Sequence, residues 1–150
     1  MNLFLDTSAI VKIYHQEKGT GKFSKYLEGI SEELFLTTSD ITKIELHSAL
    51  LKKYREKEIS KKNLSEVFQL FDKDFQKFNI IVVDRIIKNI ALFVLDSMGI
   101  KYGIRTLDSL QLASAVFFNN YSKIDFFVSS DKKLLKIAKE FFQVINPEEL

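Results

Sequence analysis

A regular alternation of short apolar segments with longer segments of helical periodicity constrains the fold of this 150-residue chain more than any other feature. The short segments are rich in residues that favour strands and cover residues 3–5, 34–38, 80–83, 125–128 and 142–145. Helical patterns lie between them, at about 23–30, 41–58, 64–75, 85–98, 106–116 and 132–140. Such alternation predicts a parallel sheet with helices on both faces and right-handed crossovers. We expect a single α/β domain over residues 1–150, a three-layer α/β/α sandwich with a central sheet of four to five strands.

Composition narrows the class of protein. With 46% hydrophobic and 28% charged residues, the chain is typical of a soluble domain with a proper core. No apolar run approaches the roughly 20 residues that a membrane-spanning helix needs. The absence of cysteine excludes disulfides, thiolate zinc sites and a cysteine nucleophile, which favours a reducing, cytoplasmic location. The net charge of +2 indicates a polyanionic partner only weakly.

Two acidic residues stand where predicted strands end. Asp6 follows the segment 3–5 and precedes Thr7, whereas Asp131 follows the segment 125–128 and its neighbour Ser129. The carboxyl ends of parallel strands meet at one edge of the sheet, where ligands bind in α/β folds. Each aspartate can equally be the N-cap of the helix that follows it, so the pattern supports a cap or a site.

Two further acids lie near the starts of predicted helices at the same edge. Glu45 shares a helix face with Ile44, so its carboxylate is expected to point inward; the alternative is an edge position with an ion pair to Lys52. Asp108 lies in the first turn after Thr106, on the face of the helix that is expected to look inward. A favourable interaction with the helix dipole would also explain it.

Convergence of these four acids would require a cation. Several carboxylates in one pocket repel one another, and a divalent cation removes that cost. The only imidazoles are His15 and His47, and neither has a partner at metal-ligand spacing. An all-oxygen site favours Mg²⁺ or Mn²⁺ over Zn²⁺.

Other polar and aromatic patterns allow simpler interpretations. Asp84 is expected to cap the helix 85–98 and not to bind a ligand. The lysine-rich stretch 52–62 indicates either a solvated surface or an RNA-facing strip. An amphipathic stripe after Ser60 indicates either intramolecular core or a surface that another chain partly covers; it consists of Leu64, Val67, Phe68, Phe71 and Phe75.

Three segments carry a resemblance to a known family. Residues 6–14 (DTSAIVKIY) resemble the opening motif of PIN-domain proteins, and residues 107–115 (LDSLQLASA) resemble their third-acid helix. Residues 128–134 (VSSDKKL) resemble the fourth-acid motif, with Ser129 where the family often has threonine. Together with Glu45 these motifs span nearly the whole chain in the expected order. The chain is similar to the toxin ribonucleases of VapBC-type toxin–antitoxin pairs.

The resemblance implies a function and its partners. It implies a PIN-like fold and an endoribonuclease that hydrolyses RNA phosphodiester bonds with Mg²⁺ or Mn²⁺. It also implies a homodimer, silenced by a cognate antitoxin protein encoded beside it.

The resemblance also implies roles for individual residues. The expected catalytic residues are Asp6, Glu45, Asp108 and Asp131. Three of them would hold metal, Asp6 and Asp108 directly and Asp131 directly or through water, while Glu45 would orient or deprotonate the nucleophile. Thr7 and Ser129 would donate hydrogen bonds that fix the carboxylates. Lys12 would contact an RNA phosphate, with a solvated lysine as the alternative.

Other classes of protein fit the motifs less well. A receiver-type phospho-acceptor domain would use Asp84 as acceptor but needs an acidic pair after the first strand, where Thr7 and Ser8 stand. A haloacid-dehalogenase-type phosphatase would need Asp-x-Asp there, and Ser8 replaces the second aspartate. A catalytically silent PIN-like module that binds RNA or a partner protein remains the main alternative to the enzyme.

Overall fold

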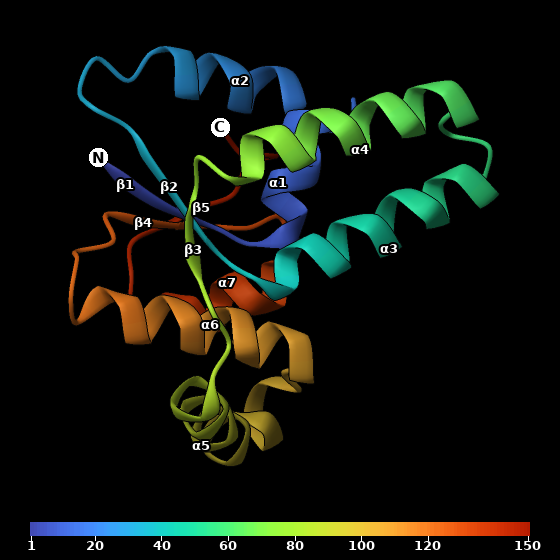
Figure 1. The fold of residues 1–150 in the computed structure, drawn as a ribbon. Coiled ribbons are helices and arrows are strands. Elements are labelled where there is room, and N and C mark those ends of the chain that lie inside the picture. Colours follow the sequence, from blue (N-terminus) through green and yellow to red (C-terminus); the bar gives the residue numbers. More distant parts are fainter.

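The computed structural model describes residues 1–150 and contains five strands and seven helices (Figure 1). In chain order these are β1 (Asn2–Leu5), α1 (Thr7–Tyr14), α2 (Thr20–Glu28), β2 (Phe35–Ser39), α3 (Ile41–Arg55), α4 (Lys61–Phe75), β3 (Asn79–Ile81), α5 (Arg85–Tyr102), α6 (Thr106–Asn119), β4 (Phe126–Val128), α7 (Lys132–Ala138) and β5 (Val144–Ile145). All strand pairs are parallel, in the order β3-β2-β1-β4-β5. The predicted α/β fold with a parallel sheet is therefore confirmed. None of the seven helices combines the length and apolar character that crossing a bilayer requires.

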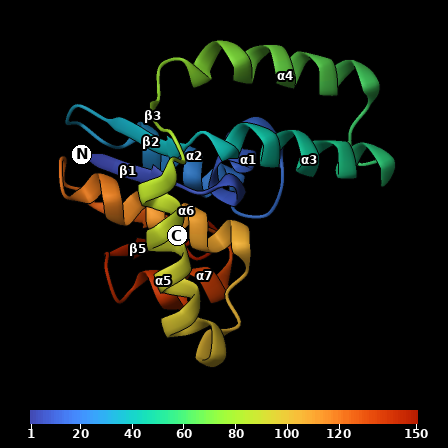
Figure 2. The same cartoon turned by 60° about the horizontal axis from the view of Figure 1, so that its bottom comes forward.

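Strand β1 lies at the centre of the sheet, and all four of its residues are buried. Leu3 and Leu5 belong to an apolar cluster with residues of α1 to α4, whereas Phe4 belongs to a second cluster with residues of α5 to α7. Because successive side chains of a strand point to opposite faces, the two clusters lie on opposite sides of the sheet. Figures 1 and 2 show the resulting three layers, with α5 packed outside α6.

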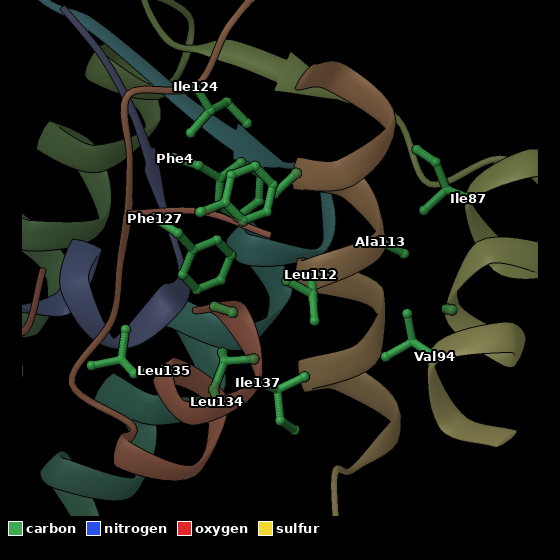
Figure 3. Close-up of a cluster of buried hydrophobic side chains, with 14 of the residues drawn as sticks. Phe4, Ile87, Val94, Leu112, Ala113, Ile124, Phe127, Leu134, Leu135 and Ile137 are labelled. Carbon is green, nitrogen blue, oxygen red and sulfur yellow. The ribbon is translucent and has the colours of Figure 1, made fainter. Parts of the chain in front are cut away.

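Helix α6 is held firmly between the sheet and α5. Figure 3 shows Leu112 on the side of the sheet, near Phe127, and Ala113 on the side of α5. Phe127 stacks on Phe4 with ring centroids 5.2 Å apart. A small residue such as Ala113 lets the two helices approach closely. The fixed position of α6 in turn fixes Asp108 in its first turn.

The order of the strands places a switch point between β1 and β4. From β1 the chain moves outward through β2 and β3 on one side, then returns to add β4 and β5 on the other. In open α/β sheets ligands bind in the crevice at such a point, outside the carboxyl ends of the strands. Asp6 and Ser129 follow β1 and β4 there, and the backbone N–H of Asp6 donates to the carbonyl of Val128 over 3.1 Å.

Helix boundaries differ from the sequence prediction in α5 and α6. Helix α5 does not end at residue 98 but continues through Gly99 to Tyr102. Of the two glycines Gly99 and Gly103, Gly103 has the left-handed conformation that ends a helix, with a φ of 63°. Helix α6 begins at Thr106 after its N-cap Arg105 and continues to Asn119 instead of ending at residue 116.

Asp40 and the aromatic stripe of α4 each have a definite structural role. Asp40 forms no capping bond on α3; its Oδ1 instead accepts from the backbone N–H of Val83 over 3.1 Å, which ties the ends of β2 and β3 together. The aromatic stripe of α4 is core: Leu64 and Phe71 are buried, and its other members pack against the same cluster. That stripe therefore gives no reason to expect a second chain.

Candidate active site

All four predicted acids line one cavity of about 390 Å³ at the carboxyl edge of the sheet. They come from four separate places: the end of β1, helix α3, helix α6 and the N-cap of α7. The complete lining is Asp6, Thr7, Ser8, Val11, Glu45, Ser48, Ala49, Lys52, Arg55, Arg105, Leu107, Asp108 and Asp131. The cavity thus combines carboxylates with a rim of basic side chains.

Asp6 is both a helix cap and a wall of this cavity. Its Oδ1 accepts from the backbone N–H of Ala9 over 2.9 Å, which caps α1, and from the hydroxyl of Ser8 over 2.7 Å. Its Oδ2 accepts from the hydroxyl of Ser129 over 2.7 Å. Ser129 also accepts from the backbone N–H of Asp131 over 2.9 Å. Cap and site are therefore not alternatives here, since one carboxylate does both.

The charge on Asp6 is costly for the metal-free protein. Only 6% of the residue is exposed. Burial is the main reason why its pKa rises from 3.8 to about 6, and the negative charge of Glu45 adds to the increase. The hydrogen bonds from Ser129, Ala9 and Ser8 oppose it. A positive charge in the cavity would remove this cost.

Glu45 reaches the cavity for a reason that differs from the prediction. Its helix buries Thr42, Leu46 and Leu50, whereas the supposed inward neighbour Ile44 is 73% exposed. Glu45 is half-buried at the edge of the buried face. The alternative, an ion pair with Lys52, does not form; the ammonium of Lys52 pairs with Glu56 at 3.9 Å.

Hydrogen bonds hold the carboxylate of Glu45 in place. Its Oε2 accepts from the hydroxyl of Thr7 over 2.7 Å and from the amide of Gln111 over 2.6 Å. Thr7 therefore lies beside Glu45, and Ser129 lies beside Asp6, so both predicted hydrogen-bond donors meet a carboxylate of the cavity.

Asp108 and Asp131 share one basic neighbour. The guanidinium of Arg105 contacts Asp108 through Nε at 3.2 Å and Asp131 through Nη2 at 3.6 Å. Burial is the largest influence on Asp108 and raises its pKa; Arg105 opposes the increase, and the charge of Asp131 adds to it. Asp131 also caps α7 through bonds from the backbone N–H groups of Lys133 and Leu134.

The donor set of the cavity fits a hard divalent cation. No group of three or more His, Cys, Asp or Glu side chains stands close enough together to hold a metal ion in the present arrangement. Carboxylates without a cation repel one another, and here hydroxyls, an amide and Arg105 take up their oxygens. No His or Cys lines the cavity, so its possible metal ligands are oxygen atoms, which Mg²⁺ and Mn²⁺ prefer.

Lys12 is buried and does not line the cavity. The residue is 2% exposed, and its ammonium donates to Glu17 over 2.7 Å, to the carbonyl of Lys18 over 2.8 Å and to Glu148 over 3.2 Å. The predicted contact with a phosphate does not fit this position, and neither does a solvated lysine. Lys12 is a buried structural cation that joins α1 to the C-terminal segment.

Several groups that contact the acids of the cavity have no clear sequence signal. Ser8, Gln111 and Arg105 contact the four acids through hydrogen bonds or ion pairs, yet none was singled out from the sequence as a site residue. Their closeness to Asp6 and Asp108 in the chain was the only available hint. Asp84, in contrast, caps α5 as predicted, accepting from Ile87 over 3.0 Å, and lies outside the cavity.

Comparisons with known proteins agree with this architecture. The family model described as the PIN domain matches residues 3–140. Among solved structures, FitAcB from Neisseria gonorrhoeae aligns with a TM-score of 0.69 and 18% identity, covering 99% of each chain. VapBC-1 from nontypeable Haemophilus influenzae aligns with a TM-score of 0.67 and 15% identity over 98% of each chain. VapBC2 from Rickettsia felis, bound to a DNA fragment from its promoter, gives 0.66 and 19% identity, covering 97% of this chain and 98% of that one. No curated protein matches the sequence.

Proposed function

The chain belongs to the PIN-domain family, a family of nucleases, and from this premise we propose that it is a Mg²⁺- or Mn²⁺-dependent endoribonuclease, the toxin of a toxin–antitoxin pair. One observation carries the proposal. Four acids from four separate elements line a single cavity at the switch point of the sheet: Asp6, Glu45, Asp108 and Asp131. Capping alone accounts for Asp6 and Asp131 but gives no reason for all four to meet.

Each acid has a role that its surroundings support. Asp6, Asp108 and Asp131 would hold the cation, whose positive charge would offset the cost of burying Asp6 and Asp108. When bound, the cation supplies Lewis acidity to the water nucleophile and to the phosphoryl oxygens of the substrate. Glu45 accepts hydrogen bonds only on Oε2, so its Oε1 can orient the nucleophile or take its proton.

The rim of the cavity supports a polyanionic substrate. Lys52 and Arg55 lie on the last turns of α3, and Arg105 lies opposite them before α6. Cations beside a carboxylate cluster let a phosphodiester chain approach acids that would otherwise repel it. Of the two predictions for the lysine-rich stretch 52–62, the part that lines the cavity favours the RNA-facing strip.

A matched pair of double variants tests the rim. Lys52→Gln with Arg55→Gln should weaken binding of single-stranded RNA and lower the slope of log affinity against log salt by about 0.7 per side chain removed. The control, Lys61→Gln with Lys62→Gln, removes the same charge from exposed positions outside the cavity. Filter binding of a labelled RNA across salt concentrations measures both. Equal losses in the two double variants would mean that only net charge matters.

The activity itself is tested with purified protein and total RNA, with and without Mg²⁺ or Mn²⁺, followed by mapping of the fragment ends. We expect internal cleavage that leaves 5′-phosphate and 3′-hydroxyl ends and stops in excess EDTA. Cleavage that continues undiminished in EDTA would contradict the metal mechanism. Retention of RNA without any cleavage would favour the silent binding module.

We also propose two protein partners, a cognate antitoxin and a second copy of the chain. The similar solved structures include a toxin–antitoxin complex from Klebsiella pneumoniae. Helix α5 exposes Ile86, Phe93 and Ile100, spaced seven residues apart on one stripe, which is a pattern suited to pairing with another helix. Co-expression with the neighbouring open reading frame should give a complex whose mass includes two toxin chains. A toxic protein that no neighbouring product neutralises would contradict the antitoxin proposal.

A further inference from the structure

We propose that Gln111 is a positioning residue for Glu45: its side-chain amide holds one carboxylate oxygen and thereby keeps the other turned to the cavity. The inference rests on the proposed function, because the oriented oxygen would serve the cation or the nucleophile. Gln111 lies on α6, one turn after Asp108, and is 2% exposed. It does not line the cavity itself, so it acts through Glu45.

The amide of Gln111 joins three elements around the site. Its Nε2 donates to Glu45 over 2.6 Å, to the hydroxyl oxygen of Thr42 over 2.9 Å and, more weakly, to that of Thr7 over 3.3 Å. Its Oε1 accepts from the hydroxyl of Ser39 over 3.1 Å. Helix α6 is therefore joined to helix α1, strand β2 and helix α3 at this one side chain.

The network has only one consistent direction of donors, which fixes the orientation of the amide. Thr38 donates its hydroxyl hydrogen to the carbonyl of Leu5, so the hydroxyl of Thr42 must donate to Thr38. The lone pairs of Thr42 are then free to accept from Gln111. A flipped amide would place its oxygen against Thr42 and against the carboxylate of Glu45, where two acceptors would face each other. The donor group must therefore face Glu45.

This orientation determines which oxygen of Glu45 is available. The amide of Gln111 and the hydroxyl of Thr7 both donate to Oε2. A buried polar network with every partner satisfied holds its members in one geometry. Oε1 accepts no hydrogen bond from the protein, and Glu45 lines the cavity. Because Gln111 and Asp108 sit on the same firmly packed helix, α6 sets the positions of two acids at once.

Binding of Mn²⁺ alone tests the role of Gln111 without relying on activity. Gln111→Met keeps the length and volume of the side chain but cannot donate. Because Glu45 would contact the cation directly or through a coordinated water, we expect a roughly 10-fold or greater loss of Mn²⁺ affinity, as is usual when a group that orients such a contact is removed. Ser114→Ala is the matched control, because Ser114 is also buried on α6 and bonds only to the carbonyl of Leu110. Isothermal titration calorimetry on folded protein, verified by circular dichroism, measures the affinities. Gln111→Asn, too short to reach Glu45, provides a second test if the methionine variant does not fold.

A double-mutant cycle separates positioning from a general structural effect. If Gln111 acts through Glu45, Gln111→Met should change Mn²⁺ affinity little in a Glu45→Gln background. Losses that multiply in the double variant, or an unchanged affinity in Gln111→Met, would overturn the proposal while leaving the nuclease proposal intact. Wild-type protein that binds no Mn²⁺ would overturn both.

Discussion

The Asp6→Asn variant should lose RNA cleavage by orders of magnitude while its metal-free form is at least as stable as the wild type. The substitution removes one charge from a buried cluster but keeps the shape of the side chain. Its Oδ1 can still accept from Ala9 and Ser8, which preserves the cap of α1. Its new amide can donate to Ser129, whose hydroxyl hydrogen can turn toward Ser8, 3.3 Å away. Under the proposed mechanism, activity should fall because the amide would hold the cation less well than the carboxylate.

The stability effect has a definite sign and pH range. The pKa of Asp6 is about 6 in the folded protein and 3.8 without the fold, so the folded state binds more protons between these values. Its contribution to stability is fully present below pH 3.8 and is lost as pH rises through about 6. At neutral pH, the free energy of unfolding lost in this way is about 2 to 3 kcal/mol. Metal-free Asp6→Asn should therefore show a flatter pH dependence and a melting temperature that is equal or higher at pH 7.

Thermal melts with and without Mn²⁺, at several pH values, measure these effects. Mn²⁺ should raise the melting temperature of the wild type far more than that of Asp6→Asn, since weaker binding to the native state contributes less stabilisation. Asp84→Asn is the control, because Asp84 also caps a helix but lies outside the cavity. It should keep the full response to Mn²⁺ and lose at most about 1 kcal/mol. An undiminished Mn²⁺ response in Asp6→Asn would show that Asp6 is not a ligand.

The sheet and the positions of Asp6 and Asp131 could be predicted because they depend on local signals. An apolar run such as Leu3 to Leu5 can only be buried, and the first polar residue after it must then lie at the edge of a parallel sheet. Asp108 was placed by its position in the first turn of α6. These inferences need only the period of the pattern and the direction of the strands.

Glu45 lines the cavity as predicted, but the helix face on which that prediction relied is not the buried one. Helical spacing assigned it to the face of Ile44, but the buried face of α3 is that of Leu46 and Leu50, which packs with residues of α1 and α4. The pattern of α3 is weak because Thr42, a polar residue, occupies the buried face. What brings Glu45 into the cavity is a pair of hydrogen bonds from Thr7 and Gln111, both far away in the sequence. Periodicity within one helix cannot reveal partners of this kind.

Lys12 is a clearer example of a residue whose partners cannot be predicted from local sequence patterns. A lysine in the opening motif, near a nuclease site, suggested a phosphate contact, because lysine is rarely buried. The structure buries it instead between two glutamates, Glu17 from the connection after α1 and Glu148 from the C-terminal segment. Such a pairing depends on how the end of the chain returns to α1, which no local pattern specifies.

Lys12→Met should therefore destabilise the protein by about 2 to 3 kcal/mol, an effect on folding that does not depend on RNA. Removing one partner of a buried ion pair typically costs 3–5 kcal/mol, because the other charge stays buried and unpaired. The expected loss is smaller here, since Glu17 keeps an ion pair with Lys53 and Glu148 keeps one with Lys18. Lys18→Met is the matched control: it removes an exposed lysine from the same Glu148, and should cost less than about 1 kcal/mol. Urea unfolding of the three proteins measures the difference.

The pH dependence of this loss identifies its cause. Burial acts to raise the pKa of Glu17, but the hydrogen bonds from Lys12 and Lys53 outweigh it and lower the pKa below the usual 4.5. An acid with a lowered folded pKa contributes stability above its unfolded pKa and loses it as pH falls through the folded value. The difference in free energy of unfolding between wild type and Lys12→Met should thus be largest at pH 7 and should decrease as pH falls below about 4.5. A gap that stays constant down to pH 3 would mean that lost packing of the lysine stem, and not the ion pairs, accounts for the loss.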